Sequence, residues 1–407
     1  MKTGATCILI AGFAFACSDS GTTNSTGTAA TTGGGGQSGS STSTSATSSG
    51  SSTSTVSTSA TGSGGATGTG GGGAAGSAGS VPDGGPILDA SSDANGGRDG
   101  SDAAANGRTP AGSPCVPGMT YGNPLPANPM ATMVKSGFTF LEGPVWMASQ
   151  NALYFSDFTN SAPTGSPGKI HKYTPGTNTF EDWLTMPTTN GLAADERGSF
   201  VAASQELRAL VRFDPVTKQQ TTVMGSDMYN GRPFNCLNDL VIRNDGNIYF
   251  SDPNYQLGGR AGQPDTSYFR LSPSGVVTRI GARTQPNGMS LSPDGQYLYV
   301  SSAEANGGGV KRHPLAADGS VMGPATDFSP LAADGMAVDC AGNLYLVSGA
   351  VTVVSPTGQM IGTIGGLPSG ADFVTNAAFG GPQAKTLYIT SANTLSQIVL
   401  NIPGLPN

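Results

Sequence analysis

Oxygen-bearing side chains recur along this chain at a spacing that could bring them together in the folded protein. The series is Glu142, Asn190, Asn238, Asn287, Asp334 and Asn376, with successive separations of 48, 48, 49, 47 and 42 residues. Most of its members are followed by Gly, and each is followed by an apolar run, a tight turn and a strand. A period in the forties indicates a repeat architecture, in which each member of the series occupies the same place in its unit.

The six side chains have the chemistry of a site for a hard cation. Two carboxylates with several amide oxygens, and no thiol or imidazole, suit calcium, with magnesium, manganese or zinc as alternatives. A single Asn-Gly or Asp-Gly is more often a turn, as we expect at Asp245, Asp294 and Asp318. The shared register before a strand, and the glutamate followed by Gly-Pro at position 142, favour ligands over turns.

The units that must position these residues have one internal order. The clearest element is the second strand, which reads LYFS (153–156), FVAA (200–203), IYFS (248–251), LYVS (298–301), LYLV (344–347) and LYIT (387–390). A Gly-containing turn precedes most of these strands, and a third and a weaker fourth strand follow in most units. Six such units predict an all-β fold, a six-bladed β-propeller of four-stranded blades.

The N-terminal end of the folded region completes this prediction. The last unit stops after three strands, whereas residues 131–140 read as a strand without a unit of its own. We expect this strand to become the outer strand of the last blade and to close the ring, which leaves no open sheet edge.

The first 110 residues differ from the rest. Residues 1–17 have the Lys, apolar stretch and small residues before Cys17 of a lipoprotein-type signal peptide, which predicts an exported protein with a lipid on Cys17, periplasmic or at the cell surface. Ordinary secretion is the alternative. Residues 18–110 are mostly Ser, Thr, Gly and Ala and predict a disordered linker, which leaves 111–407 for the propeller.

Charge and cysteine content limit the possible binding partners, disulfides and metal sites. The net charge is −7 and the chain has no cluster of Lys and Arg, which argues against nucleic acid. Cys115, Cys236 and Cys340 allow at most one bridge in the mature protein, and their spacing matches no zinc pattern. Which two pair, and the oligomeric state, stay open.

Five stretches resemble the SMP-30/gluconolactonase family over roughly residues 130–400. They are EGPVW (142–146), NCLNDLVIRNDGNIYFSDP (235–253), PNGMSLSPDG (286–295), DGMAVDCAGNLY (334–345) and TNAAFGGPQAKTLYIT (375–390). The resemblance implies a six-bladed propeller that binds a divalent cation in its channel and hydrolyses lactones, with relatives that act on organophosphates. The family's metal ligands fall on Glu142, Asn287 and Asp334, and Asn238 matches an asparagine that contacts metal or substrate.

Two departures from the family lie on the expected substrate side. Ala203-Ser204-Gln205 stands where many bacterial members have Cys-Glu-His, and Cys236 stands where some members have a substrate-binding arginine or a small residue. These changes leave the predicted metal ligands in place and put the identity of the substrate in doubt.

The sequence and the resemblance together predict a metal-dependent lactonase that acts on a sugar lactone. A cation would polarise the carbonyl, Asp334 would act as general base, and Asn190, Asn235 and Asn238 would bind the substrate. An organophosphate or non-sugar lactone hydrolase, and a non-catalytic binding propeller braced by the metal, are the alternatives. His171 and His313 lie in third strands, where we expect structural roles, and no G-x-S-x-G motif supports a serine esterase.

Overall fold

The computed structural model describes residues 113–159, 167–302 and 308–405. The predicted signal peptide, Cys17 and the predicted linker lie outside the described residues. Within the described part, no helix is both long enough and apolar enough to cross a membrane.

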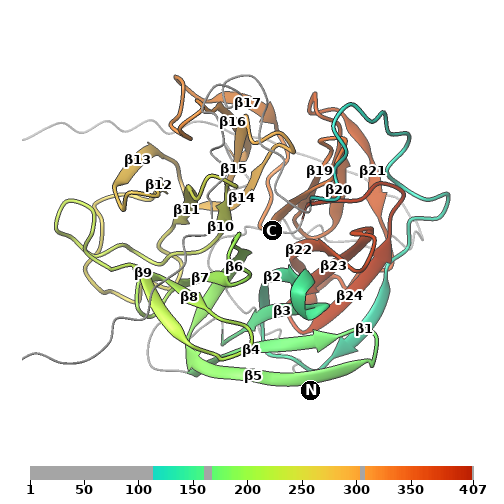
Figure 1. Cartoon of the computed structure of the whole chain (residues 1–407), viewed down its shortest axis with the longest axis horizontal. Helices are drawn as coiled ribbons and strands as arrows, with labels where there is room; N and C mark the ends of the chain where they lie inside the picture. The colour runs from blue at the N-terminus through green and yellow to red at the C-terminus, as the bar shows by residue number, and fades with distance from the viewer. Residues whose placement is uncertain (1–112, 160–166, 303–307, 406–407) are drawn as a thin grey trace, which may run out of the picture. The chain divides into compact units, whose positions relative to one another are not determined.

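Six four-stranded antiparallel sheets, blades 1 to 6, are arranged around a centre (Figure 1). Blade 1 contains β2 (Leu141–Met147), β3 (Ala152–Asp157), β4 (Pro167–Thr174) and β5 (Thr179–Pro187). Blade 2 contains β6 (Thr189–Ala194), β7 (Phe200–Ser204), β8 (Ala209–Phe213) and β9 (Gln220–Met224). Blade 3 contains β10 (Leu240–Ile242), β11 (Ile248–Asp252), β12 (Ser267–Leu271) and β13 (Val277–Ala282).

The other three blades repeat this order. Blade 4 contains β14 (Pro286–Leu291), β15 (Tyr297–Ser302), β16 (Gly309–Pro314) and β17 (Thr326–Ser329). Blade 5 contains β18 (Met336–Val338), β19 (Leu344–Val347), β20 (Val351–Val354) and β21 (Met360–Ile364). Blade 6 contains β22 (Val374–Gly380), β23 (Thr386–Ser391), β24 (Thr394–Val399) and β1 (Thr132–Ser136). Two short 3-10 helices, η2 (Ala148–Gln150) and η3 (Gly370–Asp372), lie in connections.

The first strands of the blades form the inner ring. Each of β2, β6, β10, β14, β18 and β22 contacts the first strand of the next blade, and β22 contacts β2. A residue at the start of any first strand therefore lies at the same end of the ring as its counterparts in the other blades. The predicted six-bladed propeller is confirmed.

The ring closes through the N-terminal strand. β1 pairs antiparallel with β24, with Thr132 opposite Gln397 and Ser136 opposite Thr394, which completes the sheet β1-β24-β23-β22. The prediction that residues 131–140 complete the last blade is confirmed. Pairing the two ends of the folded region in one sheet removes the edge that β24 would otherwise expose.

The hydrophobic core lies between neighbouring blades. Second strands are almost entirely buried because both faces of a blade are covered, and their aromatic residues are among the largest fully buried side chains: Tyr154, Tyr249, Tyr345 and Tyr388. Fully burying each large apolar side chain contributes about 1.5–3 kcal/mol. This explains why the repeated LYFS-type segment is the strongest signal in the sequence.

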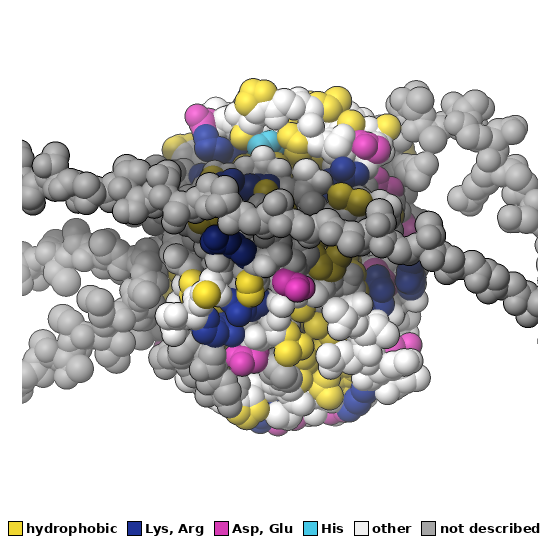
Figure 2. Space-filling view, turned by 90° about the vertical axis from the view of Figure 1, so that its left-hand side faces the viewer, with side chains coloured by type: hydrophobic (Ala, Val, Ile, Leu, Met, Phe, Trp, Pro, Cys, Tyr) yellow, Lys and Arg dark blue, Asp and Glu magenta, His cyan; other side chains and the backbone are white. Residues whose placement is uncertain are grey.

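A disulfide holds the segment before β1 against blade 5. Cys115 is bonded to Cys340, which follows β18, and Cys236 remains a buried free thiol. Further along the segment, the Asn401 amide donates to the carbonyls of Asn123 and Leu125. Figure 2 shows basic and acidic side chains interspersed on one face of the domain, in keeping with exposed ion pairs such as Arg279–Asp265.

Candidate active site at the end of the channel

The six residues of the repeating series are all buried at the beginning of the inner strands. Contacts between neighbouring blades link them in a closed ring. The links are Gly143 to Asn190, Gly191 N to Asn238 O (2.8 Å), Met289 N to Asp239 Oδ2 (2.9 Å), Asn287 Nδ2 to Asp334 Oδ1 (2.6 Å), Gly335 to Asn376, and Asn376 Nδ2 to Glu142 Oε2 (3.4 Å). The structure therefore brings the predicted residues together at one end of the channel.

The glycines after the series residues permit this close approach. A Cβ at any of these positions would collide with the neighbouring blade: Gly143 with Asn190, Gly191 with Asp239, Gly288 with Asp334, and Gly335 with Asn376. Gly143 also has a φ of +50°, which favours glycine. The recurring Asn-Gly is thus a packing requirement of the inner ring rather than a turn signal.

Hydroxyl groups from the second strands satisfy the backbone of the ring. Ser156 Oγ donates to the carbonyl of Asn190 (2.7 Å), and Thr390 Oγ1 donates to the carbonyl of Asn376 (3.1 Å). Ser301 Oγ bonds both the N–H and the C=O of Ala333, the residue before Asp334. The Ser or Thr next to the last residue of these second strands therefore positions the series residue of its own or the next blade.

Three buried carboxyl groups share this end of the channel. Burial raises the pKa of Asp334 to about 7; the Asn287 hydrogen bond opposes this rise and the charge of Asp239 adds to it. Burial raises the pKa of Asp239 to about 7 as well. Burial, and then the charges of Asp334 and Asp239, raise the pKa of Glu142 well above its ordinary value.

Asp239 is the member of this group that the sequence prediction missed. It follows Asn238 at the place where four of the other units have Gly, and its Oδ1 and Oδ2 accept hydrogen bonds from Leu240 N and Met289 N. The signal was present in the alignment of the units, because an acidic residue replaces the recurring glycine at that single position.

The donor set is that of an oxygen-ligand cation site. The described ion pairs include none of the three carboxylates, so their negative charge has no basic counterpart there. No three acidic, His or Cys side chains among the described residues are grouped so that they could hold an ion alone. Amide oxygens have to complete the set; the nitrogen of Asn287 faces Asp334, and rotation of this amide would turn its oxygen toward that carboxylate.

Asn235 differs from the other predicted substrate-binding residues. Its side-chain nitrogen donates to the carbonyl of Asp265 (3.0 Å), and Gly262 lies against its Oδ1. Its backbone N–H donates to Asp252 (3.0 Å), as does that of Cys236 (2.9 Å). The side chain thus braces the connection between β11 and β12, and a contact with substrate stays a prediction.

The connection between β11 and β12, residues 253–266, lies at the same end of the channel and is held firmly. Arg208 donates to the carbonyls of Phe234 and Ala261, and Gln263 Nε2 donates to those of Tyr229 and Arg232. Arg260 donates to the carbonyls of Gln205, Glu206 and Gln256. This connection is therefore a preformed wall beside blade 2.

The predicted structural histidines are both engaged, His171 within blade 1 and His313 between blades 3 and 4. His171 on β4 lies between Asp157 (3.0 Å) and Asp182 (2.9 Å), and His313 on β16 bonds the hydroxyl of Tyr268 (2.9 Å).

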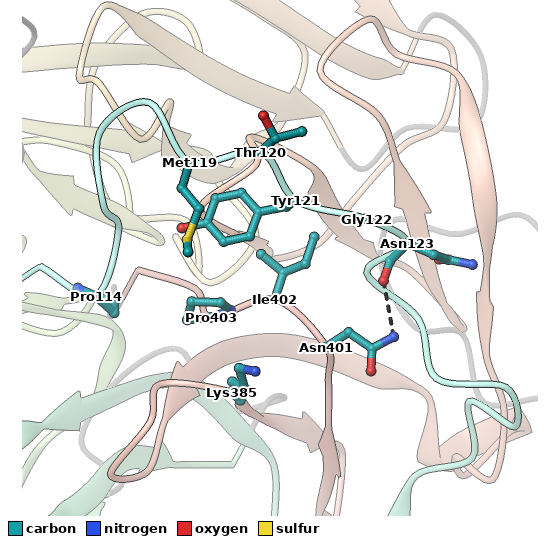
Figure 3. Close-up of a pocket in the computed structure, with 10 residues that line it drawn as sticks. All are labelled: Pro114, Met119, Thr120, Tyr121, Gly122, Asn123, Lys385, Asn401, Ile402 and Pro403. Carbon is teal, nitrogen blue, oxygen red and sulfur yellow. Dashed lines mark hydrogen bonds between the residues drawn. The ribbon is translucent and has the colours of Figure 1, made fainter.

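A cavity of about 440 Å³ lies beside the segment fastened by Cys115 (Figure 3). Its lining includes Met119, Tyr121, Lys385 and Ile402 and contains none of the channel residues.

Comparison with known proteins places the chain among lactone-hydrolysing propellers. A profile for the SMP-30/gluconolactonase/LRE-like region matches residues 140–393. The gluconolactonase of Zymomonas mobilis is 31% identical over 297 residues, which cover 65% of this chain and 80% of that protein. A gluconolactonase structure from Xanthomonas campestris has a TM-score of 0.58 at 26% identity and covers 71% of this chain and 100% of that one. The structure of regucalcin from Agrobacterium tumefaciens, a calcium-binding protein, has a TM-score of 0.57 at 19% identity, covers 70% and 98%, and shows the fold alone.

Proposed function

This chain belongs to the SMP-30/gluconolactonase/LRE-like family, and from this membership together with the channel geometry we propose that it is a divalent-cation-dependent hydrolase that opens a sugar lactone. The observation that carries the proposal is the closed ring of buried side chains, in which Glu142 and Asp334 both have raised pKa values. Buried carboxyl groups with perturbed pKa values cluster at functional sites.

We assign the cation to Glu142, Asn238, Asn287 and Asp334. These residues fit such an ion because their carboxylates are buried together without a described basic partner, a costly arrangement that a positive charge offsets. Calcium is the first ion to test, since all ligands are oxygens and a calcium-binding protein shares the fold; magnesium, manganese and zinc are the alternatives.

The residues at this end of the channel then have separate roles in binding and catalysis. The cation would polarise the lactone carbonyl and stabilise the charge that develops on its oxygen. Asp334 accepts the proton of the attacking water: as a ligand of the cation it stays ionised, and exclusion of water from the buried site keeps its carboxylate basic enough for this role. Asn190 and Asn238, next to each other in the ring, orient the oxygens of the substrate.

The test follows acid release by the purified full chain from D-glucono-δ-lactone, δ-valerolactone and a phosphotriester, with calcium, with zinc and after chelation. We expect cation-dependent turnover of the sugar lactone. Asp334→Asn should abolish it and leave the circular dichroism spectrum unchanged, whereas the exposed control Asp327→Asn should retain it. Absence of cation-dependent turnover on every substrate would instead favour a binding propeller.

We also propose that the protein is exported and tethered through a lipid on Cys17. The support is the sequence of residues 1–17 and the polar linker that follows. Labelled palmitate should enter the wild-type protein and be absent from Cys17→Ser. Incorporation that survives the substitution would contradict the tether.

A further inference from the structure

Two buried amide oxygens beside the channel have no hydrogen-bond donor among the described residues. They are Asn190 Oδ1 and Gln205 Oε1, and both side chains are only 2% exposed. Leaving a buried acceptor without a donor costs about 1–3 kcal/mol, so such atoms need an explanation. Asn190 belongs to the ring already described, whereas Gln205 has no role in it.

Gln205 lies beside the ring, at the site end of blade 2. It follows β7, and its backbone N–H donates to the carbonyl of Thr188 (3.0 Å), two residues before Asn190. Arg260 Nη2 reaches both the Gln205 carbonyl (3.4 Å) and the thiol of Cys236 (3.7 Å), two residues before Asn238. The residue therefore sits where the inner strands of blades 2 and 3 meet the wall formed by residues 253–266.

The orientation of the Gln205 amide is set by its neighbour. Gln205 Nε2 donates to Gln256 Oε1 (3.0 Å). Because this bond fixes the position of the amide nitrogen, Gln205 Oε1 is held on the opposite side of the amide, where it can accept a hydrogen bond. Arg260 holds the same stretch by donating to the carbonyls of Gln205, Glu206 and Gln256. An acceptor that is buried, oriented and braced in this way is preorganised to receive a donor.

We propose that Gln205 is a specificity-determining residue, which accepts a hydrogen bond from a ring hydroxyl of the lactone through Oε1. The inference rests on the proposed lactonase function and deepens it. Hydroxyl groups supply the donors that Gln205 and Asn190 lack; a carboxylate or sulfonate substituent brings only acceptors, and an apolar lactone brings neither. The substrate class is therefore an uncharged, polyhydroxylated lactone with a hydroxyl directed toward blades 2 and 3.

The experiment compares substrates that differ in hydroxyl groups. Gln205→Met keeps the length of the side chain and removes the acceptor; Gln205→Glu keeps an acceptor; the exposed Gln359→Met is the matched control. We expect Gln205→Met to lower kcat/KM for D-glucono-δ-lactone by about 10- to 100-fold, the range for one unsatisfied buried group, and to change the value for δ-valerolactone by less than about 3-fold. Gln205→Glu should recover part of the loss.

A binding measurement keeps this test independent of turnover. D-Glucono-δ-lactam presents the same hydroxyl groups on a ring that resists hydrolysis, and calorimetry should find it bound by the wild type and at least about 10-fold more weakly by Gln205→Met. An equal loss of kcat/KM on both lactones, unchanged affinity for the lactam in the variant, or no lactam binding by the wild type would each overturn the role of Gln205. In the last case, an ordered water would be the sole partner of Oε1. Lack of lactone turnover with lactam affinity that still depends on Gln205 would overturn the proposed hydrolysis alone.

Discussion

The side-chain nitrogen of Asn287 donates a 2.6 Å hydrogen bond to Oδ1 of Asp334, and this contact joins blade 4 to blade 5 at the channel. The two residues are 47 positions apart in the sequence and occupy equivalent places in successive repeats. The pair shows how one repeated position becomes a site: each blade contributes one side chain, and the ring sets the neighbours side by side.

Asp239→Asn should stabilise the metal-free protein and weaken its response to calcium. The substitution removes one of three buried like charges and keeps the shape of the side chain, although its amide can accept only one of the two hydrogen bonds that Leu240 N and Met289 N donate to Asp239. Because burial raises the pKa of Asp239 to about 7, ionising it at pH 8 opposes folding, and we expect the variant to gain on the order of 2 kcal/mol there after chelation. Urea unfolding with and without calcium measures both effects, and a variant that loses stability after chelation would contradict this account.

Gly143→Ala should destabilise the seam between blades 1 and 2. A Cβ at this position would collide with the backbone of Asn190 and Gly191, and φ is +50°, so we expect a loss of about 2–4 kcal/mol. Gly275→Ala is the matched control, because Gly275 also has positive φ but faces open space. That control should lose only about 1–2 kcal/mol. Equal losses in the two variants would remove close packing as the reason for the recurring glycine.

Replacing Cys115 with Ser should lower the free energy of unfolding by about 2–4 kcal/mol, the usual range for a disulfide that closes a long loop. Cys115 and Cys340 are 225 residues apart, and the bridge fastens the start of the segment before β1 to blade 5, whereas hydrogen bonds from Asn401 and Gly365 hold its later part. Limited proteolysis should then cut between residues 113 and 129 while the blades stay intact. Reduced wild-type protein should behave as the variant does; a difference between them would point to the serine itself.

Acid should destabilise the protein partly through His313. Burial, with smaller contributions from Lys311 and Arg283, lowers the pKa of His313 to about 4, whereas an unfolded chain binds this proton near its ordinary value. Stability from the neutral ring is complete above that ordinary value and is lost as the pH falls toward 4, by up to about 3 kcal/mol. His313→Gln should flatten this part of the curve in thermal melts between pH 7 and 4.5. Parallel curves for the two proteins would exclude His313.

The repeat alone determined the fold and the register of the site. Inner-ring residues recur at a near-constant spacing, and fully buried second strands carry a strong apolar pattern, so the six blades, the closing strand and positions such as Glu142 could be read from the sequence. Periodicity is informative here because every blade must present the same element to the same neighbour.

Interactions between blades were decided only by the tertiary structure. The sequence shows Asp239 only as a polar residue before a strand. In the folded ring its charge lies close enough to Glu142 and Asp334 to raise their pKa values. The partner of Cys115 could not be chosen between Cys236 and Cys340, because pairing depends on how a segment outside the repeats crosses blade 5. Gln205 acquires its orientation from Gln256, on the connection between β11 and β12. The contacts of Cys115 and Gln205 join residues that no common period relates, so only packing in three dimensions could reveal them. Asp239 stands in the repeat register, but its effect on the other two carboxyl groups depends on the distances within the ring.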